Sequence, residues 1–61
     1  MTWLLRRKSD GLYLQRFNSK MSTWTESRFA AKAYVRKSDA IRSKNMMRIL
    51  GTVVEIVEFE G

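Results

Sequence analysis

The chain has 61 residues, of which 44% are hydrophobic and 30% charged, and it contains neither cysteine nor histidine. A chain of this length buries about 60% of the surface that it exposes when unfolded, so its core supplies only roughly 3–5 kcal/mol of stability. Without Cys and His there are no disulfides and almost no zinc, haem or iron–sulfur sites, so we expect one domain over residues 1–61, with no metal and no cofactor.

The charge is strongly positive, because 12 Lys and Arg oppose 6 Asp and Glu. Residues 1–51 contain all 12 cations and three acids and therefore carry +9, whereas residues 52–61 carry −3. No His or Cys is present to act as a base or nucleophile near neutral pH, and the glycines are too isolated for a phosphate-binding loop. We therefore predict a binding protein without catalytic residues, not an enzyme. Its basic surface is expected to attract anions, unless the cations only keep the protein soluble.

Two apolar-rich segments, 2–8 and 12–18, flank the pair Asp10-Gly11. Asp-Gly between such segments is a strong hairpin signal. A two-residue loop places Arg7 opposite Leu14, and a loop that also includes the preceding serine shifts the pairing by one residue. Both registers remain open.

The two-residue register gives the predicted hairpin two different faces. One face carries the apolar side chains of Trp3, Leu5, Leu12 and Leu14. The other carries Leu4, Arg6, Lys8, Tyr13, Gln15 and Phe17. Aromatic rings among cations suit stacking on bases and contact with phosphates. The alternative is that these aromatics form the core beneath the helix and that Trp3 is turned outward.

The middle of the chain is predicted to contain a turn, a short helical turn and a short strand. Residues 18–23 are polar and indicate the turn. Thr23 or Thr25 is expected to cap a short helical turn that follows Trp24-Thr25 and runs through Ala31, and Thr23 with Glu26 three residues later fits a capping box. A short strand over 32–36 follows, and a single helix over 26–50 is the alternative.

The clearest helix is predicted over about 39–50, with Ser38 as its N-cap, Asp39 in its first turn and Gly51 as its C-terminal stop. At 100° per residue, one face carries Ala40, Ser43, Met46, Met47 and Leu50, which we expect to form the core. The other side carries Ile41, Arg42, Lys44, Asn45, Arg48 and Ile49. An exposed Ile41 among cations suits a protein contact, and an ordinary solvated helix side is the alternative.

Residues 52–60 form the best strand by propensity. Val53, Val57 and Phe59 point one way, and Val54 and Ile56 point the other way. A strand that is apolar on both faces is central in its sheet or covered by a partner, so we expect a homo-oligomer through this strand, with a dimer favoured. Glu55, Glu58 and Glu60 are expected to be solubilising charges, with Glu55 paired to an arginine such as Arg7 or Arg16.

Together these elements predict an α+β fold. It consists of an N-terminal β-hairpin, a short helical turn, a short strand, and one main helix (about 39–50) packed on a small, mostly antiparallel sheet with a C-terminal strand (about 52–60). No stretch approaches the ~20 apolar residues of a membrane span, and the first residues lack the order of a signal peptide. We therefore expect no leader and no membrane partner.

One set of positions resembles a group of small proteins encoded by tailed bacteriophages. The shared pattern is Trp-Thr, a small residue six positions after the Thr, an aromatic three further on, and Ala six later. Here these positions are Trp24, Thr25, Ala31, Tyr34 and Ala40. The hairpin and the C-terminal alternation of Val or Ile with Glu also resemble this group. The resemblance implies a shared fold and an accessory role in the cytoplasm of the bacterial host, and it carries over no functional residue.

The sequence and this resemblance predict a non-catalytic phage accessory protein that binds, and inhibits or sequesters, a host component. The partner is expected to be an acidic host protein or a phosphate-bearing ligand such as a nucleotide. The candidate partner-binding residues are Arg6, Lys8, Tyr13, Arg16, Phe17, Ile41, Arg42, Lys44 and Arg48. Two alternatives remain open: a nucleic-acid-binding protein that uses the same residues, and a structural or assembly subunit of a phage complex.

Overall fold

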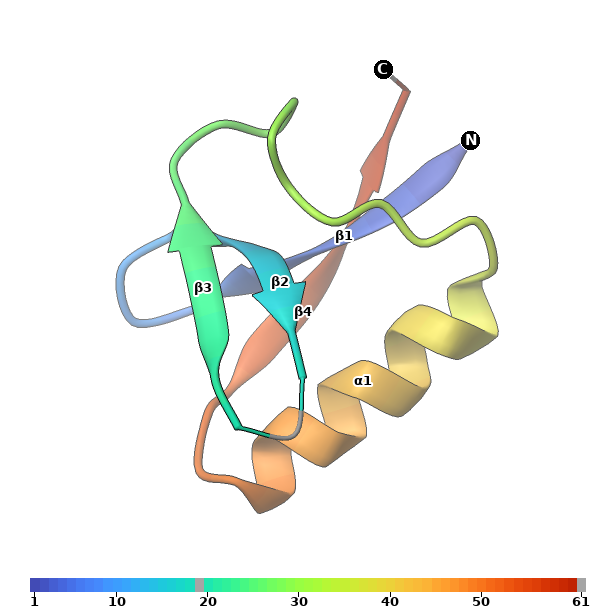
Figure 1. The fold of residues 1–61 in the computed structure, drawn as a ribbon. Coiled ribbons are helices and arrows are strands. Elements are labelled where there is room, and N and C mark those ends of the chain that lie inside the picture. The colour runs from blue at the N-terminus through green and yellow to red at the C-terminus, as the bar shows by residue number, and fades with distance from the viewer. Residues whose placement is uncertain (19, 61) are drawn as a thin grey trace.

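The structure is a computed structural model that describes residues 1–18 and 20–60. Its elements in chain order are β1 (Thr2–Arg7), β2 (Tyr13–Phe17), β3 (Ser22–Thr25), α1 (Lys37–Ile49) and β4 (Val54–Phe59). The strands form one antiparallel sheet in the order β3-β2-β1-β4, and α1 packs against β1 and β4 (Figure 1). The predicted α+β fold, with its N-terminal hairpin, single main helix and C-terminal strand, is confirmed.

The core lies between α1 and the side of the sheet that faces it, here called the helix side. Its buried residues are Leu5, Leu14, Tyr34, Ala40, Met47 and Val54. Trp3, Phe17, Trp24 and Ile56 are partly buried and pack against them. Trp3 therefore points toward the core together with Leu5 and Leu14, as the predicted apolar hairpin face requires, and it is not turned outward.

The hairpin register differs from both predicted registers. Arg6 pairs with Tyr13, whereas a loop of two or three residues would place Gln15 or Leu14 opposite it. Arg7 and Leu12 form the last pair before the loop, since the Arg7 N–H donates a hydrogen bond to the Leu12 carbonyl at 2.7 Å. The loop therefore consists of four residues, 8–11.

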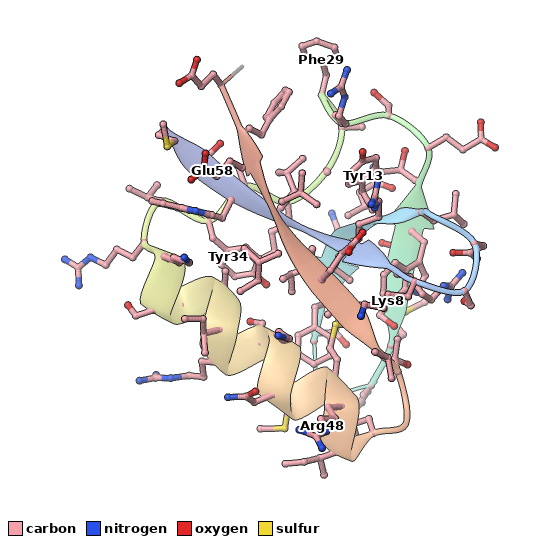
Figure 2. All side chains as sticks on the ribbon, turned by 180° about the vertical axis from the view of Figure 1, so that it is seen from behind. Lys8, Tyr13, Phe29, Tyr34, Arg48 and Glu58 are labelled. Carbon is pink, nitrogen blue, oxygen red and sulfur yellow. The ribbon has the colours of Figure 1, made fainter. Side chains whose placement is uncertain are left out.

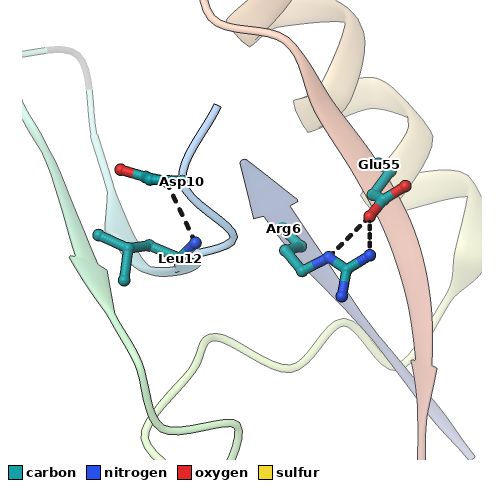
Figure 3. A network of polar contacts seen from close by, with 4 residues as sticks. All are labelled: Arg6, Asp10, Leu12 and Glu55. Carbon is teal, nitrogen blue, oxygen red and sulfur yellow. Dashed lines mark hydrogen bonds and ion pairs between the residues drawn. The ribbon is translucent and has the colours of Figure 1, made fainter. Parts of the chain in front are cut away.

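Asp10 and Gly11 stabilise this longer loop. Gly11 has φ of +75°, which glycine adopts at little cost, and its N–H donates to the Arg7 carbonyl at 2.8 Å. The Asp10 carboxylate accepts hydrogen bonds from the Leu12 N–H at 3.2 Å and from Arg7 Nε at 3.0 Å (Figure 3 draws the first). The Asp-Gly signal therefore located the loop correctly but not its length.

A bulge at Gln15 changes the second half of β2. In the ladder between β2 and β3, Leu14 pairs with Trp24 and Arg16 pairs with Thr23, which leaves Gln15 as an extra residue. An extra residue reverses the alternation of side chains beyond it. Phe17 consequently packs against the core, while Tyr13 lies opposite Arg6 on the far side of the sheet. The predicted common face of Tyr13 and Phe17 is therefore wrong.

The segment before the helix is mostly irregular, which corrects three expectations. Trp24-Thr25 belongs to β3 and not to a helical turn, and a hydrogen-bonded turn occurs only over 28–30. In place of a strand over 32–36, Tyr34 forms a single bridge with Trp3, through N–H···O bonds of 2.8 and 2.9 Å. No helix extends over 26–36, so the single long helix is also wrong.

These three expectations failed because the segment is held by contacts with distant residues, which local sequence patterns cannot indicate. Trp24 packs against the core, and the Arg7 guanidinium carbon lies 4.3 Å from the centroid of the Trp24 ring. These two contacts favour a strand at Trp24 over a helical turn. Thr23 lies within β3, so the predicted capping box with Glu26 does not form, and Thr25 Oγ1 accepts a hydrogen bond from the Ser27 N–H at 3.1 Å. Of the predicted turn over 18–23, Ser19 lies outside the described residues and the last two residues belong to β3.

Helix α1 begins before the predicted cap and ends where predicted. Its N-cap is Arg36, in extended conformation and without a side-chain cap, so the predicted cap at Ser38 is wrong. At the other end Gly51 has φ of +93° and donates to the Arg48 carbonyl, and the Thr52 N–H donates to the Met47 carbonyl at 2.8 Å. These two bonds form a Schellman motif, which confirms the glycine stop.

β4 lies at the edge of the sheet rather than at its centre. It pairs with β1 at six consecutive positions, from Thr2 opposite Phe59 to Arg7 opposite Val54. The second apolar face of β4 lies on the side of the sheet away from α1. On that side Leu4 of the neighbouring strand β1 is fully buried, and the Phe29 ring packs edge-on against the Phe59 ring with centroids 5.4 Å apart. The loop after β3 thus contributes to covering the second face of this strand.

Leu14→Ala tests the position of the core. Leu14 is fully buried, so its truncation should lower the free energy of unfolding by about 2–5 kcal/mol, most of what a domain of this size has. Urea denaturation followed by circular dichroism measures this. Leu12→Ala, at a half-buried position of the same hairpin, is the control and should cost clearly less. Equal losses in the two variants would contradict the described core.

Asp10→Asn tests the loop ion pair through its pH dependence. The hydrogen bond from Arg7 holds the pKa of the Asp10 carboxyl below its ordinary value of about 3.9. Because the folded-state pKa is the lower one, the carboxylate stabilises the fold above about pH 4, and this contribution is lost as pH falls through the folded-state pKa.

Wild type should therefore be more stable than Asp10→Asn at pH 7, and the difference in free energy of unfolding should vanish toward pH 2. The asparagine can still accept the bond from the Leu12 N–H, so the comparison isolates the charge. Glu26→Gln removes an exposed acid that belongs to neither ion pair and is the matched control. A stability difference independent of pH would be inconsistent with the Arg7–Asp10 pair.

Candidate functional site

Helix α1 exposes most of its circumference. Of its 13 residues only Ala40 and Met47 are buried, and Ser43 is half-buried, with its hydroxyl oxygen accepting a hydrogen bond from the Tyr34 hydroxyl at 3.0 Å. Met46 and Leu50, expected in the core, are 48% and 67% exposed. The physical reason is the width of the support: α1 packs on β1 and β4, so only one narrow stripe of the helix is covered.

The exposed part of α1 combines cations with aliphatic side chains. We call it the basic helix surface, and it consists of Ile41, Arg42, Lys44, Arg48 and Ile49. Ile41, Lys44 and Arg48 follow one another at i, i+3 and i+7 and therefore share one side of the helix. Asp39 in the first turn is the one acid of the helix and lies three residues before Arg42, but it belongs to neither ion pair, and residues 40–51 contain no acid beside Lys44 and Arg48. All four candidates that the sequence placed on this helix are exposed here.

A shallow apolar groove adjoins this surface at the C-terminal end of α1. It is lined by Phe17, Asn18, Met46 and Leu50, and a neighbouring hollow adds Lys20 and Met21. Phe17 forms the wall between this groove and the core, so its role is packing and not stacking on a base. The pattern of the helix did not predict the groove, because it assigned Met46 and Leu50 to the core.

Arg6 is already bound within the protein. It lies directly opposite Glu55 in the ladder between β1 and β4, and its Nε donates to Glu55 Oε1 at 2.6 Å, with a second bond from Nη2 (Figure 3). This hydrogen bond, more than any other contact, raises the pKa of Arg6. Glu55 was expected to pair with Arg7 or Arg16, but the register brings Arg6 to it instead. Arg6 therefore has less charge to offer an external anion.

The remaining candidate cations lie apart from α1 and from each other. Lys8 follows β1 and lines a cleft with Ser9, Gly51 and Thr52, and in Figure 2 it lies near the start of β4. Arg16 is exposed at the bulge of β2. Tyr13 is half-buried on the far side of the sheet. The structure thus brings together the helix candidates and separates them from those of the hairpin.

Ile49→Lys tests whether the aliphatic side chains of the basic helix surface are free. Ile49 is 79% exposed, so the substitution should change the free energy of unfolding by less than about 0.5 kcal/mol. Met47→Lys, two residues earlier, buries an unpaired charge and should cost about 3–5 kcal/mol. Thermal or urea unfolding measures both variants. A large loss for Ile49→Lys would mean that this side chain is packed.

Among residues 1–18 and 20–60, no helix has the length and apolarity needed to cross a membrane, and no three potential metal-ligating side chains come together. Comparisons with family models, curated proteins and solved structures found no match. A proposal for the function therefore rests on the side chains of the basic helix surface.

Proposed function

We propose that this chain is a non-catalytic accessory protein of a bacteriophage that binds, and thereby inhibits or sequesters, an acidic host protein through the basic helix surface. The observation that carries the proposal is that α1 buries only Ala40 and Met47 and exposes aliphatic side chains among cations that belong to neither ion pair. The phage origin, the cytoplasmic location and the inhibitory role rest on the resemblance of the Trp24-Thr25 pattern to small phage proteins.

The distribution of ion pairs supports this choice of surface. In the part of the chain that the structure describes, the two ion pairs are Arg6–Glu55 and Arg7–Asp10, and both neutralise cations of β1. Arg42, Lys44 and Arg48 on α1 belong to neither pair. The charges of these three helix residues are therefore not offset by an ion pair, and they can attract an anionic partner.

The apolar component favours a protein partner over a nucleic acid. Interface centres in protein complexes are apolar and surrounded by a polar rim, and methionine adapts well to irregular contacts. Ile41, Ile49 and the apolar groove with Met46 and Leu50 provide such a centre beside the cations. A single-stranded nucleic acid would instead need aromatic rings on one open face, and Tyr13 and Phe17 lie on opposite sides of the sheet.

Charge reversal on α1 tests the proposal. The tagged wild type should capture a defined acidic protein from host lysate, identified by mass spectrometry. Arg42→Glu/Arg48→Glu should weaken binding of that purified protein at least about tenfold, mainly by slowing association. Arg28→Glu/Lys32→Glu changes the charge equally on exposed positions of the loop before α1 and should bind nearly as wild type. Equal loss in both variants, or none in the first, would reject the basic helix surface.

Nucleic-acid binding is the outcome that would replace this proposal. Non-specific binding to phosphates weakens steeply with salt, with a slope near one per phosphate contacted. We expect no shift of double-stranded DNA or single-stranded RNA at about 200 mM salt in a fluorescence anisotropy titration. Tight binding that survives this salt concentration and is lost in Arg42→Glu/Arg48→Glu would assign the same surface to a nucleic acid.

A further inference from the structure

The outer edge of β4 carries backbone groups that no neighbouring strand takes up. β4 is the last strand of the sheet order, and β1 is its one strand partner within residues 1–18 and 20–60. Figure 1 shows β4 behind the other strands, and in Figure 2, seen from behind, it lies in the foreground. Among the described residues, the outer edge of β4 is therefore not covered by another strand.

The hydrogen-bond pattern identifies which residues point outward. In an antiparallel ladder, successive residues direct their N–H and C=O groups to alternate sides. The Lys8 N–H donates to the Val53 carbonyl at 3.1 Å, so Val53 bonds toward β1. By alternation Glu55, Val57 and Phe59 also bond toward β1. The residues left with outward N–H and C=O groups are Val54, Ile56 and Glu58.

This edge has few of the features that normally prevent strands from joining. Proteins protect an edge with a bulge, a proline, a very short strand or inward-pointing charge. The ladder of β4 is regular over six residues, contains no proline, and has its Glu55 charge neutralised by Arg6. The opposite edge strand β3 has only four residues, and its ladder to β2 is interrupted by the bulge. β4 is therefore the edge better suited to pairing.

We propose that β4 pairs with β4 of a second copy of this chain, antiparallel and centred on Ile56. The three outward residues are symmetric about this position. Ile56 then lies opposite Ile56 of the second copy, and Val54 opposite Glu58, in both directions. Each such pair exchanges two backbone hydrogen bonds, so about six bonds join the two sheets into one continuous sheet. This proposal does not depend on the proposed function.

Charge opposes contact with a second copy less at this edge than at the basic parts of the chain, because Arg6 neutralises one of the three acids of residues 52–61. The molecule carries +6, and its residues 1–51 carry +9, so most pairs of surfaces from two copies repel each other. Residues 52–61 carry −3 and form the part of the chain that is not basic. In the register centred on Ile56, Glu58 lies opposite Val54 and not opposite the Glu58 of the other copy, so like charges do not face each other directly.

The pairing also sets the geometry of the dimer. Two antiparallel strands that join edge to edge are related by a twofold axis perpendicular to the sheet. Both copies of α1 therefore lie on the same side of the continuous sheet. The small interface, one strand from each copy, predicts a weak and concentration-dependent dimer.

Glu58→Pro is the sharpest test. Glu58 is exposed, and its N–H points outward, so proline removes a donor of the dimer while the bonds from β4 to β1 remain. Sedimentation velocity between about 10 µM and about 1 mM should show wild type associating with increasing concentration. The dimer dissociation constant of Glu58→Pro should be at least about tenfold higher. Glu58→Ala, which keeps the N–H, should dimerise at least as well as wild type.

A second measurement covers the case in which proline disturbs the fold. In wild type, amide hydrogen exchange at Ile56 and Glu58 should slow as the protein concentration rises, whereas exchange at Val57, which bonds inward, should not. A wild type that stays monomeric up to about 1 mM would overturn the proposal. The edge of β4 would then be suited to pairing with a strand of a different protein. Equal dimerisation of a folded Glu58→Pro and of Glu58→Ala would overturn it as well.

Discussion

The pairing of β1 with β4 is the interaction on which the rest of this structure depends. It joins the first and last strands of the chain over six residue pairs, including a hydrogen bond from Thr2 Oγ1 to the Phe59 carbonyl across 57 residues of sequence. β1 is bonded on both of its edges, and its Leu4 and Leu5 are fully buried on opposite sides of the sheet. Because α1 rests on these two strands, the helix has no support unless both ends of the chain have met.

The small size of this support explains the properties of the surface. A sheet that meets α1 through two strands covers one stripe of the helix, so aliphatic side chains of the last turns remain in solvent. In a larger domain further elements would cover them. Here the end of β2 and the following turn form only a groove beside Met46 and Leu50. The limited core and the exposed apolar surface thus have the same cause.

The two ion pairs of the described residues neutralise arginines of β1 and none of the cations of α1. The acids of the hairpin loop and of β4 neutralise Arg7 and Arg6, respectively, and Figure 3 draws the second of these pairs, Arg6 with Glu55. Both pairs follow from register, since Glu55 lies opposite Arg6 and Asp10 lies in the loop that begins after Arg7. Arg42, Lys44 and Arg48 on the helix belong to neither pair, although Asp39 lies three residues before Arg42. The two proposed contacts therefore use different chemistry: cations and aliphatic side chains on α1, and backbone hydrogen bonds on β4.

The sequence by itself determined those features that depend on local periodicity and on single turn residues. The α1 helix with its Gly51 stop, the hairpin around Asp10-Gly11, the two-faced strand β4 and the α+β class all follow from such patterns. Tertiary structure alone decided the four-residue loop, the bulge at Gln15 and the edge position of β4. It also decided that Phe17 packs beneath α1 while Tyr13 lies on the other side. The physical reason is that the alternation of apolar and polar residues shows which side chains share a face of a strand. It does not show how many residues remain unpaired in a loop or a bulge. That number is set by the packing of side chains from distant segments, here Trp24 on the core and Tyr34 against Trp3.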